Sequence, residues 1–428
     1  SEILLKKMGL ERMRSDQSMY MMKRARKNGR PAVLIVCVYV DDLIVAYSDV
    51  EIRDEFKATL DGHIKMKDVG PLAYCLGMHV VQQPETYSVT INQEGFVRDL
   101  LDRTGFSTGD VRPTKVPAPP NERLSVKDSP TTDAERSEMT KAPYCMYRSI
   151  VGSLMYLTGA TRPDIGYAVN QLARHVANPG KRHWKFLEYL LRYLAGTPHL
   201  GVHYCGNKLQ GLILQDEVNR GYWASPDVLP QAELLSESFS NNVMSYADSD
   251  WASDEDTRRS TSGWVTFMNG GPLSWRVKRQ EVVAASSAGA ELYSLGDCIK
   301  EVVWLQKLLG ELGFPQPHRA PGRGGATAEP DSVKNRGSVI YEDNRGAQMI
   351  SQNNVFHQRT KHVATRWAFI LDYVNQGHVC VTSCGTEDQI ADLLTKGVNR
   401  AIMEKLRPLL MGTWCIAPGS MPVLSRNR

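Results

Sequence analysis

Residues 33–47 read VLIVCVYVDDLIVAY and decide how the first part of the chain folds. Val33 to Val40 are apolar or aromatic, Leu43 to Tyr47 resume that character, and Asp41 and Asp42 stand between the two runs. Each run has the length and β-branched content of a strand, which predicts a hairpin with the aspartates at its tip. Adjacent carboxylates repel each other unless water or a divalent cation screens them. Taken alone, such a pair more often marks an ordinary polar turn.

The composition is that of an ordinary globular protein with local basic clusters. The 428 residues are 42% hydrophobic and 23% charged, which suits roughly two to four domains. The net charge of +4 is weak evidence for a nucleic-acid partner, but basic residues gather in three groups that suit a phosphate backbone. These groups are Lys6, Lys7, Arg12, Arg14, Lys23, Arg24, Arg26, Lys27 and Arg30; Lys181, Arg182 and Lys185; and Arg276, Lys278 and Arg279.

The cysteines and the hydropathy pattern exclude several protein classes. The 8 cysteines follow no framework spacing, which predicts that all are reduced and argues against a zinc site. No apolar run approaches the roughly 18 residues of a membrane span. The basic N-terminal segment lacks the apolar core of a signal peptide. We therefore expect a soluble protein that is not secreted and contacts no membrane.

Hydrophobic periodicity predicts strands, helices and two loose insertions beyond the hairpin. The expected elements are helix 52–60, strands 72–81 and 87–92, helix 93–104, a loop at 107–143, helices within 147–196, and insertions at 207–242 and 315–337. A third part then runs strand 244–249, strand 263–268, strand 273–277, helix 288–312, strand 338–341, helix, helix 366–376, strand 378–383 and helix 387–396. Three strands followed by alternating helices and strands predict a mixed sheet covered by helices.

Acidic residues recur in this third part where strands end or helices begin. Asp248 and Asp343 end predicted strands, Glu291 lies in the first turn of the long helix, and Asp392 lies on the last helix. Carboxylates gathered from separate elements repel strongly unless divalent cations bind between them. Two Mg²⁺ ions roughly 4 Å apart would bind such a set, activate a water and stabilise the leaving oxygen of a phosphodiester. Any one of these acids alone is more often a solvated residue at the end of an element.

The segments around these acids resemble, in the same order, motifs of copia-type retrotransposon Pol polyproteins. YVDDLIVA at 39–46 resembles the metal-binding turn of the reverse transcriptase, and YADSDWA at 246–252 resembles the start of the ribonuclease H domain. The other matching motifs are LAYCLG at 72–77, YRSIVGSL at 147–154, TRPDI at 161–165, LRYLAGT at 191–197, RRSTSG at 258–263, SWR at 274–276, SS at 286–287 through Glu291, EDN at 342–344, HQRTKH at 357–362 and EDQIAD at 387–392.

The resemblance implies an α/β and α+β multidomain protein: a partial reverse-transcriptase palm with a helical thumb and connection, then a ribonuclease H-like mixed five-stranded sheet flanked by helices. Asp248, Glu291, Asp343 and Asp392 would be catalytic and hold two Mg²⁺ (or Mn²⁺) ions for cleavage of the RNA strand of RNA–DNA hybrids. Nucleic-acid contacts would come from both the sheet and the HQRTKH motif. They are Arg276, Lys278, Asn344, His357, Arg359, Lys361 and His362.

Some positions within this set are contestable. Asp250 shares a strand face with Asp248, and Asp388 shares a helix face with Asp392. We prefer Asp248 and Asp392 because they match the motif positions. Gly289 stands where relatives usually carry a further glutamate, which removes negative charge near the site.

The reverse transcriptase part is expected to be incomplete. Asp41 and Asp42 would be two metal ligands of a polymerase site, but the third carboxylate belongs to an upstream strand and Asp16 lies in a polar, basic stretch. The expected divisions are a palm and thumb fragment without fingers at 1–115, a linker and helical connection at 116–206, a linker or insertion at 207–243, the ribonuclease H-like domain at 244–412 and a tail at 413–428. We expect the C-terminal part of a longer polyprotein or a fragment of a decayed element, without polymerase activity of its own.

The expected partners are RNA–DNA hybrid, primer–template nucleic acid and the rest of the Pol polyprotein, in a cytoplasmic particle or the nucleus of the cell. Two alternatives stay open. One is a non-catalytic, nucleic-acid-binding remnant that uses the basic clusters without turnover. The other is an integrase-like nuclease, which leaves the Tyr39–Asp42 hairpin and the Trp251 motif unexplained.

Overall fold

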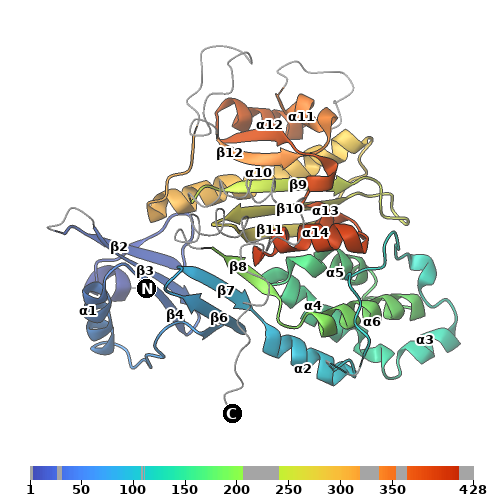
Figure 1. Cartoon of the computed structure of the whole chain (residues 1–428), viewed down its shortest axis with the longest axis horizontal. Helices are drawn as coiled ribbons and strands as arrows, with labels where there is room; N and C mark the ends of the chain where they lie inside the picture. The colour runs from blue at the N-terminus through green and yellow to red at the C-terminus, as the bar shows by residue number, and fades with distance from the viewer. Residues whose placement is uncertain are drawn as a thin grey trace, which may run out of the picture. The chain divides into compact units, whose positions relative to one another are not determined.

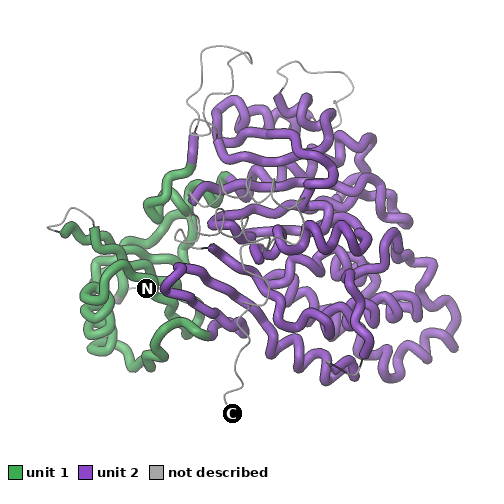
Figure 2. Tube along the Cα trace, in the orientation of Figure 1, with its two compact units in different colours: residues 1–73, 303–316 green, residues 74–302, 317–428 purple. Residues whose placement is uncertain are grey.

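The computed structural model describes residues 3–26, 31–107, 109, 111–205, 241–318, 337–352 and 364–413. Figure 2 shows the two compact units of the chain, which are Ser1–Ala73 with Val303–Gln316, and Tyr74–Val302 with Pro317–Arg428. Most of the predicted insertions at 207–243 and 315–337 lies outside the described residues.

The first unit contains a four-stranded antiparallel sheet in the order β1-β2-β3-β4 (Figure 1). Its elements are β1 (Glu11–Arg12), β2 (Met19–Arg24), β3 (Ala32–Tyr39), β4 (Asp42–Tyr47) and α1 (Val50–Asp61). β3 and β4 are the predicted hairpin, since Tyr39 pairs with Asp42 across the turn. Side chains alternate along β3, so Leu34 and Val36 are fully buried and pack with one face of α1.

The second unit begins with a sheet and a group of helices. The sheet has the order β5-β6-β7-β8, with β5 (Tyr74–Cys75), β6 (Met78–Gln83), β7 (Ser88–Asn92) and β8 (Gly201–Tyr204). The helices are α2 (Glu94–Thr104), α3 (Asp133–Met139), α4 (Tyr147–Ala160), α5 (Gly166–Ala173) and α6 (Lys181–Gly196). Gly105 ends α2 in the left-handed conformation at φ 76°, as expected of a glycine directly after a helix.

The same unit contains a mixed five-stranded sheet in the order β11-β10-β9-β12-β13 (Figure 1). Its strands are β9 (Met244–Asp250), β10 (Thr261–Met268), β11 (Gly271–Arg279), β12 (Ser338–Glu342) and β13 (Val379–Ser383). β9, β10 and β11 pair antiparallel, whereas β12 pairs parallel with both β9 and β13. The helices of this part are α10 (Ser287–Leu312), α11 (Arg345–Gln352), α12 (Ala364–Asn375), α13 (Asp392–Thr395) and α14 (Arg400–Leu410). The C-terminal residues of α10, from Val303 on, belong to the first unit. The predicted mixed sheet flanked by helices is confirmed.

The helix predicted at 387–396 is wrong. The structure has a 3₁₀ turn at Thr386–Asp388 and the short helix α13 instead. Gln389 explains the break, because its side-chain amide donates to the Ala247 carbonyl at 2.9 Å while its Oε1 accepts from the Ala391 N–H at 3.2 Å. These side-chain bonds replace the backbone ladder of a continuous helix and fix the segment against β9.

The prediction that every cysteine is reduced is also wrong, because Cys205 is disulfide-bonded. Six of the cysteines in the described part of the chain are free. Spacing along the sequence cannot reveal such a bond, since a disulfide depends on spatial proximity.

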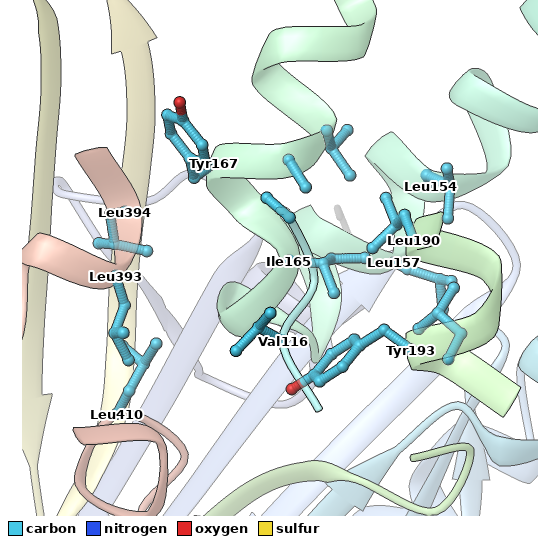
Figure 3. Close-up of a cluster of buried hydrophobic side chains, with 14 of the residues drawn as sticks. Val116, Leu154, Leu157, Ile165, Tyr167, Leu190, Tyr193, Leu393, Leu394 and Leu410 are labelled. Atoms are coloured by element: carbon cyan, nitrogen blue, oxygen red, sulfur yellow. The ribbon is translucent and has the colours of Figure 1, made fainter. Parts of the chain in front are cut away.

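One apolar core contains residues of helices α4–α6 and of helices α13 and α14. Figure 3 shows Leu154, Leu157 and Ile165 near Leu190, with Leu393 and Leu394 belonging to the same buried cluster. Trp275 of β11 adds a polar tie, since its indole N–H donates to the Thr158 carbonyl of α4 at 2.7 Å. The mixed sheet therefore shares its packing with the helical segment at 147–196.

Candidate active site: a carboxylate cluster at the end of the mixed sheet

Three acidic side chains meet at one end of the mixed sheet. Carboxylate oxygens of Asp248, Glu291 and Asp343 lie within 4.8 Å of one another, the one such group of possible metal ligands among the described residues. The sheet register explains two of them. Tyr341 of β12 lies beside Tyr246 of β9 in a parallel pair, so the acids two residues further along each strand emerge at the same end and on the same face.

Glu291 comes from the other side, on α10. The helix starts at Ser287, which places Glu291 directly after its first turn rather than within it. The Ser286 hydroxyl accepts from the Gly289 N–H at 3.1 Å and caps the start of the helix. One turn later, the Ser294 hydroxyl donates to the Gly263 carbonyl at 3.1 Å, which holds the helix against β10.

Asp392 is adjacent to this group but not part of it. It begins α13, is largely buried, and forms an ion pair in which its Oδ1 lies 2.8 Å from Lys396 Nζ. The same ammonium lies 3.5 Å from Asp248 Oδ1, and the Thr395 hydroxyl donates to Asp248 Oδ2. Lys396 therefore links Asp248 to Asp392, and Thr395 holds Asp248 in addition.

Gly263 permits this approach of α13 to the strands. It pairs with Asp248 across β9 and β10. A methyl group at Gly263 would lie 2.7 Å from Leu394 Cβ and from Thr395 Cγ2, closer than real side chains pack. A glycine at this point of β10 is thus what allows Thr395 to reach Asp248.

Burial and mutual repulsion raise the pKa of Glu291, Asp343 and Asp392. Burial raises the pKa of Asp343, with Asp248 adding to it, and burial followed by Asp248 raises the pKa of Asp392 to about 7. Burial raises the pKa of Glu291 well above its usual value, and the negative charge of Glu342 is the next largest cause. Burial opposes the charge of Lys396, but Asp248 and Asp392 outweigh it and raise the pKa of its ammonium. An excess of buried negative charge is the electrostatic condition for binding a cation.

The two rival acids have basic partners of their own. Asp250 Oδ2 lies 3.2 Å from a guanidinium nitrogen of Arg123, and Asp388 Oδ1 lies 3.0 Å from Lys405 Nζ. Burial raises the pKa of Asp250 although Arg123 opposes the shift. Each rival is thus compensated by a side chain outside the acidic group.

Sequence reasoning missed Glu342, Lys396 and Thr395. Glu342 is the last residue of β12 and is completely buried, whereas its neighbour Asp343 is only partly buried. The available signal was a glutamate at the end of the apolar strand SVIYE, where alternation turns it away from the face of Asp343. Nothing in the sequence reveals that Lys396 pairs with Asp248, because the two are 148 positions apart.

The predicted nucleic-acid contacts are only partly described. Arg276 is exposed on β11, and Lys278 on the same strand forms an ion pair with Glu281 at 2.6 Å. The Asn344 side chain accepts from the Ala347 N–H at 3.1 Å and so caps α11. Four further candidates, His357, Arg359, Lys361 and His362, lie outside the described residues.

The hairpin turn of the first unit exposes both of its aspartates. Asp41 and Asp42 are exposed, and Val40 before them is 83% exposed with φ at 51°. A β-branched residue at positive φ is strained by roughly 1–3 kcal/mol, and such strain concentrates at functional turns. No third acid joins Asp41 and Asp42 in a group of possible metal ligands within the described part of the chain.

Known proteins resemble this chain over most of its length. Residues 2–118 match the family described as reverse transcriptase (RNA-dependent DNA polymerase). The chain is 31% identical over 396 residues, 92% of its length, to the retrovirus-related Pol polyprotein from transposon TNT 1-94 of Nicotiana tabacum. It is 32% identical over 391 residues to the corresponding polyprotein from transposon RE2 of Arabidopsis thaliana. The chain belongs to the copia-type Pol polyproteins of transposons.

This copia-type chain spans 25% of the length of the tobacco polyprotein and 22% of the Arabidopsis one. Among solved structures, a ribonuclease H1 isolated from compost aligns with 39% of the chain and 99% of its own length, at 15% identity and a TM-score of 0.26. Within the described residues, no helix is both long and apolar enough to cross a membrane.

Proposed function

We propose that this copia-type chain hydrolyses the RNA strand of RNA–DNA hybrids in a reaction that depends on a divalent cation, with Mg²⁺ as the expected ion. The observation that supports it is the convergence of Asp248, Glu291 and Asp343 from β9, α10 and the end of β12. These three carboxylates come from separate elements and repel one another, which destabilises the folded state unless a cation binds between them.

The donor set fits a hard cation. All three side chains offer carboxylate oxygens, the ligands that Mg²⁺ and Mn²⁺ prefer, and the described residues place no cysteine or histidine in the group. Glu291 is 5% exposed and its Oε2 has no hydrogen-bond partner. A buried carboxylate oxygen without a donor is costly unless a cation binds it.

The chain's own residues have separable roles in this proposal. Asp248, Glu291 and Asp343 would hold the cation, with Asp392 as the fourth acid of the set, and Thr395 and Lys396 orient Asp248. When bound, the cation would activate a water and stabilise the leaving oxygen of the phosphodiester. Arg276 and Lys278 would contact the nucleic-acid backbone, which is polyanionic.

The test is cleavage of a hybrid labelled on its RNA strand, with Mg²⁺ supplied. Asp343→Asn should abolish cleavage because it removes one charge from the group without changing side-chain shape. Asp388→Asn is the matched control, since Asp388 pairs with Lys405 outside the group and its loss should leave the rate within about twofold. Hybrid binding, measured separately by gel shift, should persist in both variants.

The outcomes separate the competing functions. Cleavage that survives in Asp343→Asn would refute the assigned site. A parent chain that binds hybrid but never cleaves it would favour the non-catalytic remnant. For Asp41 and Asp42 we propose metal binding only as part of a polymerase site completed by a further carboxylate, and we expect no primer extension by this chain alone.

A further inference from the structure

Glu342 is an additional buried acid beside the carboxylate cluster. It ends β12 immediately before Asp343 and is 0% exposed. Alternation along the strand turns it to the face that carries Ile340, opposite to that of Asp343. Glu342 is therefore a buried acid directly beside Asp343 in the chain, on the opposite face of the strand. After burial, the charge of Glu342 contributes to the raised pKa of Glu291 on α10.

The polar partners of Glu342 do not compensate its charge. One oxygen accepts from the Asn344 N–H at 3.1 Å, and Oε2 has no hydrogen-bond partner. Glu291 Oε2 is likewise buried without a donor. Glu342 and Glu291 are thus two buried carboxylates that each keep one oxygen without a hydrogen-bond donor.

Burial raises the pKa of Glu342 well above its usual value, and the charge of Lys396 opposes that shift less than Asp248 and Asp343 add to it. Lys396 pairs with Asp248 and Asp392, whereas no ion pair is found to Glu291 or Glu342 among the described residues. Among the described residues, Asp343, Glu291 and Glu342 are therefore the acids of the site without an ion-pair partner. A divalent cation at the neighbouring group would relieve both acids at once.

We propose that Glu342 strengthens divalent-cation binding by adding a further buried negative charge beside the group of Asp248, Glu291 and Asp343. This inference rests on the proposed function, because it uses the same cation site. Glu342 is a positioning residue in this scheme: it acts on the cation through Glu291 and contacts no substrate. Gly289 stands where relatives usually carry a further glutamate. Glu342 would restore negative charge near the site from a different position in the chain.

The test is isothermal titration of the metal-free chain with Mn²⁺ at about pH 8, where most carboxyl groups are ionised. Glu342→Gln keeps the shape and the acceptor for the Asn344 N–H, and should raise the Kd for Mn²⁺ roughly tenfold. The melting temperature without metal should stay equal or rise, because a buried repulsion is removed. Glu301→Gln is the matched control, since this half-buried glutamate of α10 already accepts from the Ser274 hydroxyl at 2.7 Å.

Three results are decisive. A Kd for Glu342→Gln within twofold of the parent, with Asp343→Asn much weaker, would overturn the role of Glu342 and leave the site intact. Equal binding by the parent and Asp343→Asn would instead refute the proposed site. If Glu342→Gln does not fold, Glu342→Thr, whose side chain suits a strand, is held to the same tenfold expectation.

Discussion

The buried ion pair between Arg162 and Asp164 should be the most sensitive point of the second unit. Both side chains are 0% exposed. Arg162 donates from Nε and Nη2 to the two oxygens of Asp164, at 2.8 Å each, and from Nη1 to the Thr197 carbonyl at 2.9 Å. The Tyr193 hydroxyl also donates to Asp164 Oδ2 at 2.8 Å. The network thus fixes the start of α5 to the end of α6.

Arg162→Met keeps an unbranched apolar stem and removes three of these hydrogen bonds. It leaves Asp164 buried with Tyr193 as its remaining donor within the network. Breaking a buried pair by deleting one partner costs roughly 3–5 kcal/mol of unfolding free energy. At roughly 2–4 °C for each kcal/mol, the melting temperature should fall by about 10 °C.

Urea denaturation of the parent, Arg162→Met and the double variant Arg162→Met/Asp164→Leu provides the measurement. The double variant should recover part of the loss, because it no longer buries an unpaired carboxylate. Arg136→Met serves as the control, since Arg136 pairs with Asp133 on an exposed face and its loss should leave the denaturation midpoint unchanged. A loss below about 1 kcal/mol in Arg162→Met, or a double variant as unstable as the single one, would refute this account.

Three further outcomes follow from the packing and the electrostatics of the site. Gly263→Ala places a methyl group against Leu394 and Thr395, and should lower the free energy of unfolding by roughly 1–3 kcal/mol and reduce hybrid cleavage. Gly152→Ala on α4 is the control, since a methyl group there meets nothing within 4 Å and should not destabilise the protein. Equal melting temperatures for the two variants would count against the close approach at Gly263. Because burial and Asp248 raise the pKa of Asp392 to about 7, the native state holds protons that the unfolded chain releases, so the metal-free protein should lose stability as pH rises from about 4 to 7. The pKa values of the proposed ligands Glu291 and Asp343 are raised as well, so Mn²⁺ must displace protons from them. Its Kd should therefore fall as pH rises towards 8, and a Kd independent of pH in this range would contradict these shifts.

The sequence predicted the strands of the mixed sheet and the acids at their ends, because alternation and β-branched runs are local properties. It did not predict the break at Gln389, since a buried amide that reaches the Ala247 carbonyl depends on a contact between distant segments. The disulfide at Cys205 escaped for the same reason. Boundaries and pairings that tertiary contacts decide are thus beyond a reading of local pattern.

The distribution of charge at the site shows why the missed residues matter. Asp248 and Asp392 are compensated by Lys396, a side chain only a third exposed that lies within the protein itself. Glu291 and Glu342 form no ion pair among the described residues, and each keeps a buried oxygen without a donor. The charge of Lys396 opposes only part of the raised pKa of Glu342. A cation that binds Asp248, Glu291 and Asp343 would therefore be attracted by Glu291 and Glu342 and opposed by Lys396. Removing Glu342 should weaken that attraction, whereas removing Lys396 should not. Glu342 belongs to the EDN motif at 342–344, but its expected effect on metal affinity follows from its burial and not from the motif.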